Sequence, residues 1–148
     1  MDAVDRSILQ TLMHDGRATW ADLAVELGLT APAIAQRVRR MHDRGLIRGF
    51  AALAAPERLA PVTAFVRLSL TAPETDVPSL VSQTPHIQEC HRVAGDYEYV
   101  LKLRCGSLQH LAELTRALGV NARLSTSVVL ETHKESVALP IPDDGEDA

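Results

Sequence analysis

The fold of the first part of the chain is decided by residues 19–45, TWADLAVELGLTAPAIAQRVRRMHDRG. Thr19 followed by Asp22 has the form of a helix-capping box with aspartate in place of glutamate, and Gly28 is a helix stop signal. The apolar stripe expected between these signals consists of Leu23, Ala24 and Leu27. The stretch therefore opens with a short amphipathic helix.

A second helix follows in the same stretch. Thr30 can cap it, Pro32 costs no intrahelical hydrogen bond because it lies in the first turn, and Gly45 ends it. At about 100° per residue, three apolar side chains share a narrow sector that must face a core. They are Ile34, Val38 and Met41. Upstream, residues 4–14 have helical spacing of Val4, Ile8, Leu9 and Leu12, and DGR at 15–17 ends that segment.

The three helices within residues 1–45 fit a helix-turn-helix whose last helix carries a basic stripe. That stripe consists of Ala33, Arg37, Arg40 and Arg44, with Gln36 beside it. Arginine can pair bidentately with guanine and glutamine with adenine, while an alanine methyl can touch thymine. A solvated, arginine-rich helix face is the alternative interpretation of the same residues.

The charge distribution removes an objection to DNA binding. The chain of 148 residues has a net charge of −4, but residues 1–60 hold eight arginines against seven acids, a net +1. Residues 61–148 hold seven basic residues against twelve acids, a net −5, and these acids can lie away from DNA. Aromatic residues make up only 3%, which leaves little material for stacking on single-stranded nucleic acid.

The N-terminus, the cysteines and the histidines indicate the cellular compartment and bear on whether a metal or cofactor is expected. The N-terminus carries Asp2 and Asp5 where a signal peptide needs positive charge, and no apolar run is long enough to span a membrane, so a cytoplasmic protein is expected. The two cysteines are too few for a disulfide framework. The six histidines have poor metal-ligand spacing, and no phosphate-binding or nucleophile motif occurs, so neither metal, cofactor nor catalysis is expected.

The second half of the chain follows a different period. After an extended linker at 46–61, apolar and polar residues alternate over 62–70, as in a strand with one buried face. The segments that follow are predicted to be a helix (75–84), two strands (86–94 and 97–105), a helix (about 107–118) and a strand (124–133). Tyr97 and Tyr99 share one face of the third strand, and Leu108 and Leu111 lie on the apolar side of the second helix. Gly95-Asp96 fits a two-residue type II′ hairpin.

This order is βαββαβ, a ferredoxin-like domain with an antiparallel sheet, so the expected fold class is α+β with an N-terminal, winged helix-turn-helix. Helices cover one face of such a sheet, and a partner subunit is the usual cover for the other. The predicted division is a helix-turn-helix domain (1–45), a linker (46–61), a ferredoxin-like domain (62–139) and a disordered acidic tail (140–148).

Taken together, these segments resemble the Lrp/AsnC, or feast/famine, family of transcription regulators. The segments that carry the resemblance are VDRSILQTLMHDGRATWADLAVELGLTAPAIAQRVRRMHDRGLIRGFAAL, IQECHRVAGDYEYVLKLR, GV at 119–120 and VVLETHKESVALPI. The resemblance implies binding to double-stranded DNA, dimerisation through the sheets, assembly of four dimers into an octamer, and an amino-acid effector.

The resemblance also implies site residues by position. Those facing DNA would be Pro32, Ala33, Gln36, Arg37 and Arg40, to which the stripe adds Arg44. Those near the effector would be His91, Val93, Gly95, Asp96, Tyr97 and Thr126. We therefore expect a sequence-specific, effector-responsive transcription regulator. The alternatives are a ferredoxin-like small-molecule-binding protein or enzyme, and an architectural DNA binder without an effector.

Overall fold

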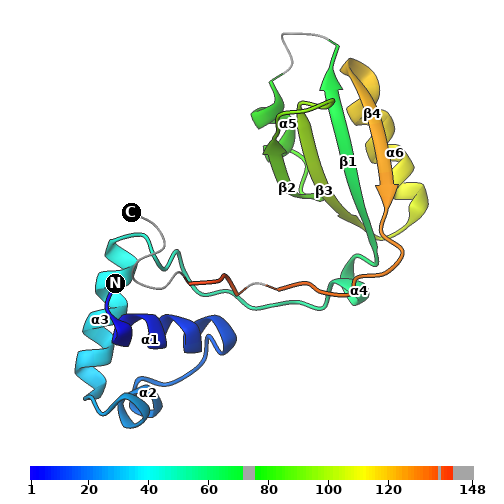
Figure 1. Cartoon of the computed structure of the whole chain (residues 1–148). Coiled ribbons are helices and arrows are strands. Elements are labelled where there is room, and N and C mark those ends of the chain that lie inside the picture. The colour runs from blue at the N-terminus through cyan, green and yellow to red at the C-terminus, as the bar shows by residue number, and fades with distance from the viewer. Residues whose placement is uncertain (72–75, 137, 142–148) are drawn as a thin grey trace. The chain divides into compact units, whose positions relative to one another are not determined.

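The computed structural model describes residues 1–71, 76–136 and 138–141, which form two compact units. The first comprises Met1–Leu53 with the described residues of 134–141, and the second comprises Ala54–His133. We describe each unit by itself (Figure 1). No helix among the described residues is long and apolar enough to cross a membrane.

Three helices build the first unit: α1 (Ala3–His14), α2 (Trp20–Leu27) and α3 (Ala31–Asp43). Each begins at a capping side chain that accepts a backbone N–H three residues on, as expected for N-caps. The caps are Asp2, Thr19 and Thr30. Gly28 ends α2 in the left-handed conformation (φ 65°), which glycine adopts without a steric penalty. The predicted helices and the predicted caps Thr19 and Thr30 are confirmed, whereas the Asp2 cap of α1 was not predicted.

The core of the first unit is aliphatic and lies where the three helices meet. The side chains expected on the core face of α3 are buried, with 0%, 7% and 2% exposed for Ile34, Val38 and Met41. They pack with Ile8 of α1 and Leu23 of α2. After α3, residues 46–55 contain neither helix nor strand, so the described chain shows no strand-built wing there.

The C-terminal end of the described chain returns to the first unit. Residues 138–141 form one wall of an open hollow of about 520 Å³, whose other wall includes Gln10, His14 and Glu26 of α1 and α2. The disordered acidic tail was predicted over residues 140–148: Pro140 and Ile141 lie in this wall, and 142–148 lie outside the described residues.

The second unit is the expected βαββαβ domain. In chain order its elements are α4 (Pro56–Leu59), β1 (Val62–Leu70), α5 (Val77–Ser82), β2 (Ile87–Arg92), β3 (Tyr99–Cys105), α6 (Leu108–Leu118), a 3-10 turn (Gly119–Asn121) and β4 (Ala122–Val128). The strands form one antiparallel sheet in the order β2-β3-β1-β4.

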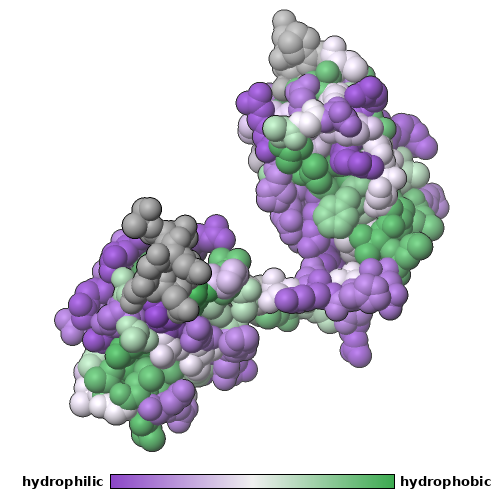
Figure 2. Space-filling view, viewed as in Figure 1, coloured by the Kyte–Doolittle hydropathy of each residue, from purple (hydrophilic) through white to green (hydrophobic). Residues whose placement is uncertain are grey.

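Both longer helices of this unit contribute to a core on the same face of the sheet. The inner-face residues Val66, Leu101 and Leu103 are at most 1% exposed, and Leu111 and Leu118 of α6 pack with them. On α6, Leu108 is 62% exposed, so the predicted apolar side of this helix is wrong at its first residue. Apolar surface gathers where α6 begins and β4 ends (Figure 2).

The predicted two-residue hairpin at Gly95-Asp96 is wrong. β2 ends at Arg92 and β3 begins at Tyr99, and the six-residue connection is closed by a bond from the Val93 N–H to the Glu98 carbonyl at 2.8 Å. The loop is tied to β1 instead of folding tightly on itself, since the Glu98 N–H donates to the Leu68 carbonyl at 3.0 Å. Gly95 lies in this loop at φ 145°.

The last strand is shorter than predicted, and it begins earlier. β4 runs over Ala122–Val128, whereas the sequence predicted 124–133. The ladder ends because β1 begins at Val62: Val128 pairs with Ala64, and the Val129 N–H donates to the Thr63 carbonyl. Beyond that point β4 has no neighbouring strand to bond with.

Candidate functional site

The outward side of α3 is the first candidate site. Thr30 Oγ1 accepts the Ala33 N–H at 3.4 Å, which fixes the start of the helix. Four of the residues predicted to face DNA are exposed here and one is half-buried. The exposed ones are Pro32, Gln36, Arg40 and the C-cap Arg44, and the half-buried one is Ala33. The structure thus brings a small, apolar start and a basic end together on one exposed side.

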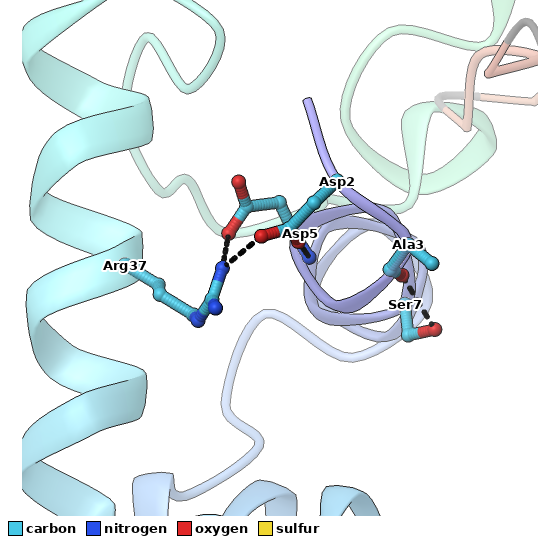
Figure 3. A network of polar contacts seen from close by, with 5 residues as sticks. All are labelled: Asp2, Ala3, Asp5, Ser7 and Arg37. Atoms are coloured by element: carbon cyan, nitrogen blue, oxygen red, sulfur yellow. Dashed lines mark hydrogen bonds and ion pairs between the residues drawn. The ribbon is translucent and has the colours of Figure 1, made fainter. Parts of the chain in front are cut away.

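Arg37, also predicted to face DNA, is engaged within the protein. Its Nη1 donates to Oδ2 of Asp2 at 2.6 Å and to Oδ1 of Asp5 at 2.7 Å (Figure 3). Only 24% of its side chain is exposed, against 54% for Asp2 and 16% for Asp5. We call these three residues the Asp2–Arg37–Asp5 cluster. The sequence analysis noticed both aspartates but assigned them no role at this site.

The pKa values of Asp2 and Arg37 are shifted in the directions expected for paired charges. The pKa of Asp2 is lowered, mainly by the N–H of Asp5 and then by the guanidinium of Arg37. The pKa of Arg37 is raised by its hydrogen bonds to Asp2 and Asp5. Both shifts favour the charged forms of Asp2 and Arg37.

A second candidate site surrounds the loop between β2 and β3. The ring of Tyr97 is close to two guanidinium groups, those of Arg67 of β1 and Arg123 of β4, each with its central carbon 5.4 Å from the ring centroid. The backbone carbonyl of Asp96 accepts from the Ser69 hydroxyl at 3.3 Å and from Arg123 at 3.4 Å. The sequence analysis missed both arginines, because only the strand register places them beside this loop.

The residues predicted to bind the effector are only partly brought together. Gly95, Asp96 and Tyr97 share the loop, and Val93 closes it. The expected common strand face of Tyr97 and Tyr99 is not found, since Tyr97 precedes β3 and its ring is near Arg67 and Arg123.

Two further predicted effector residues lie on opposite edges of the sheet. His91 is on edge strand β2, within 3.4 Å of Glu89, whose pKa is lowered mainly by its bond from Lys102. Thr126 is on the other edge strand, paired with the buried Val66. Within one chain, His91 and Thr126 therefore do not share a site.

Metal-binding side chains do not cluster in the part of the chain that the structure describes. No group of three or more His, Cys, Asp or Glu side chains there could hold a metal ion. His86 and His110 make an edge-to-face ring contact with centroids 4.4 Å apart. Burial raises the pKa of the Cys90 thiol, which is the direction expected of a packing residue.

Comparison with known proteins assigns both units. Residues 1–42 match the AsnC-type helix-turn-helix domain, and residues 63–139 match the Lrp/AsnC ligand binding domain. The chain is 36% identical to the leucine-responsive regulatory protein of Escherichia coli, over 95% of this chain and 92% of that one. It is 33% identical to the HTH-type transcriptional regulator LrpA of Mycobacterium tuberculosis, over 89% and 91%.

Solved structures agree. The feast or famine regulatory protein of Mycobacterium tuberculosis, complexed with L-methionine, has a TM-score of 0.87 and 33% identity, covering 95% of this chain and 99% of that chain. A transcriptional regulator of Neisseria meningitidis, also complexed with L-methionine, has a TM-score of 0.87 at 26% identity, covering 95% and 96%.

The helix-turn-helix and the ligand-binding domain together define a DNA-binding transcription regulator and not an enzyme. The chain belongs to the Lrp/AsnC family, and the resemblance stated from the sequence is confirmed.

Proposed function

We propose that this regulator reads the major groove of double-stranded DNA with α3, and that Pro32, Ala33, Gln36, Arg40 and Arg44 are the residues that meet the DNA. The observation that carries this proposal is the division of α3 into a buried apolar side and an exposed side that ends in arginines. Gln36 and Arg40 lie on one turn of the exposed side and have the geometry to pair with base edges. Arg44, one turn on, suits a backbone phosphate.

Arg40→Ala tests the reading side of α3. We expect it to weaken binding to DNA taken from upstream of this chain's own gene by about tenfold or more, the cost of one good base contact. A mobility-shift titration at stated salt concentrations measures the change. Arg116→Ala, which removes an exposed arginine from α6, is the matched control and should bind as wild type does. Equal shifts for wild type and Arg40→Ala would contradict the proposal.

We also propose that an amino acid is the effector and that the loop at 93–98 forms part of its site. Two relatives were solved with L-methionine. The chemistry of the loop supports the proposal, since guanidinium groups bind carboxylates well and Arg67 and Arg123 flank Tyr97. Because His91 and Thr126 lie on opposite edges of the sheet, a site that uses both needs residues from more than one chain.

A thermal melt of the full chain against each of the twenty amino acids tests the effector proposal. We expect at least one amino acid to raise the melting temperature, since a ligand at a hundred times its Kd stabilises by about 2.7 kcal/mol. The increase should be lost in Asp96→Ala and kept in Glu113→Ala, an exposed carboxylate on α6. No increase with any amino acid would favour an architectural DNA binder without such an effector.

Self-association through the outer face of the sheet completes the proposal. α5 and α6 pack on the inner face of the sheet. On the outer face, Phe65 of β1 is 42% exposed and pairs across the ladder with Lys102 of β3. A second copy would cover this face and make the regulator a dimer with two reading helices. Assembly of four such dimers into an octamer is the larger form that the family resemblance implies.

A further inference from the structure

Arg37 differs from Arg39 and Arg40, its neighbours on α3, in where its guanidinium goes. Arg39 and Arg40 are exposed, whereas Arg37 is 24% exposed and donates to both carboxylates of the Asp2–Arg37–Asp5 cluster. These contacts join residues 35 and 32 positions apart in the chain, so they are tertiary contacts between α3 and the start of α1.

The carboxylate of Asp2 is already held in place without Arg37. Oδ1 of Asp2 caps α1 by accepting the Asp5 N–H at 2.8 Å, which leaves Oδ2 for the guanidinium (Figure 3). Both side chains also lie at the start of α1, where the helix dipole is positive and attracts negative charge. At Asp2, Arg37 therefore meets an acceptor that is already oriented, so less side-chain freedom is lost when that contact forms.

The same geometry makes Arg37 a poor partner for DNA. The cluster holds two negative charges and one positive charge, so it repels a phosphate. If the guanidinium turned toward DNA, its two short, charge-assisted hydrogen bonds would be broken. The half-buried carboxylate of Asp5 would then lose its positively charged partner. On the helical wheel, Arg37 lies about 40° from Met41 and about 60° from Ile34, which are both buried.

We propose that Arg37 is a positioning residue of the DNA interface: the Asp2–Arg37–Asp5 cluster ties α3 to the first turn of α1 and sets the angle at which Gln36 and Arg40 enter the groove. This inference rests on the proposed function, because it assigns a role within DNA reading. It replaces the expectation that Arg37 faces DNA. The apolar core packs against one side of α3. The cluster adds hydrogen bonds to a neighbouring side of the helix, and these are directional, whereas aliphatic contacts are not.

The salt dependence of DNA binding separates positioning from contact. Wild type and Arg37→Met are titrated with the upstream DNA fragment and with a scrambled fragment of equal length over a range of salt concentrations. We expect Arg37→Met to weaken binding to the upstream fragment by about threefold to thirtyfold, while the slope of log K against log salt stays as in wild type. A slope smaller by about 1 would mean a lost phosphate contact and would overturn the proposal.

Removing the two carboxylates distinguishes an Arg37 that contacts DNA from an Arg37 that positions α3, because the two roles predict opposite changes in the preference for the upstream fragment. In Asp2→Asn/Asp5→Asn, an Arg37 that contacts DNA would be released and two negative charges would be lost, so preference for the upstream fragment would hold or rise. A positioning Arg37 loses its anchor, so we expect preference for the upstream over the scrambled fragment to fall by about threefold or more. Unchanged or greater preference would overturn the proposal.

A combined variant tests whether the loss of DNA preference in Arg37→Met results from breaking the contacts within the cluster. In Arg37→Met/Asp2→Asn/Asp5→Asn no unpaired charge remains, so we expect its preference to recover part of the loss seen in Arg37→Met. A loss equal to the sum of the separate losses would count against the cluster. If Arg37→Met does not fold at the assay temperature, Asp5→Asn replaces it and keeps Arg37 in place.

Failure of the proposed function would look different. If wild type itself shows no preference for any upstream fragment, DNA reading fails first. A double-mutant cycle of Arg37→Met and Asp5→Asn, followed by amide exchange in α3, then tests the tie between α1 and α3 on its own. Independent effects in that cycle would overturn the inference.

Discussion

Replacing Ile34 by alanine is expected to lower the free energy of unfolding of the helical unit by about 2–5 kcal/mol, the usual cost of emptying a well-packed aliphatic site. Ile34 has no exposed surface and packs in one cluster with Ile8 of α1 and Leu23 of α2. Because it lies in the first turns of α3, the resulting cavity loosens the part of the helix that carries Gln36 and Arg40. DNA binding should therefore weaken together with stability.

Amide hydrogen exchange in the full chain measures the loss of stability in Ile34→Ala separately for the helical unit and for the sheet unit. Amides of α1–α3 should lose protection in Ile34→Ala, while those of β1 and β3 should keep theirs, since the two units have separate cores. Val25→Ala is the matched control, because Val25 lies in the same unit but is 85% exposed, and its effect should stay below about 0.5 kcal/mol. If the two variants behave alike, Ile34 is not part of the core that holds α3.

Phe65→Arg is expected to convert the assembled protein into single chains. Phe65 stands on the outer face of β1, directly across from Lys102 and two residues from Arg67. If a second copy covers this face, the new guanidinium is buried beside other positive charges without a partner. Such an uncompensated charge costs about 3–5 kcal/mol, which raises the dissociation constant by more than about a hundredfold.

Sedimentation velocity over a range of protein concentrations measures the change. Val25→Arg adds the same charge at an exposed apolar site of the helical unit, so it should sediment as wild type does. A wild type that is already monomeric, or a Phe65→Arg variant of unchanged mass, would show that this face is not the interface.

Much of the fold could be predicted because its signals are local. The N-caps Thr19 and Thr30 and the glycine after α2 act within a few residues, and the buried side of α3 follows from helical spacing alone. The βαββαβ order also follows from local changes of period. These signals need no knowledge of what lies across the core.

The errors arose where a distant segment decides the local structure. The loop after β2 is wider than a two-residue hairpin because Glu98 bonds to β1, thirty residues upstream. β4 stops where its neighbour β1 begins. The same reason explains why the contacts of Arg37 were not predicted: periodicity places it in the basic stripe, but its partners Asp2 and Asp5 lie at the start of α1, and nothing in the local pattern of α3 points to them.

The return of residues 138–141 to α1 and α2 changes how the chain as a whole can be cut. The chain leaves the helical unit after Leu53 and comes back to it at Lys134, so the sheet unit is an insertion within the helical unit and not an appendage after it. A fragment that stops near residue 53 would therefore lack a strip of its own surface. A fragment made to study the helical unit alone would need residues from both ends of the chain, 1–53 and those from 134 on.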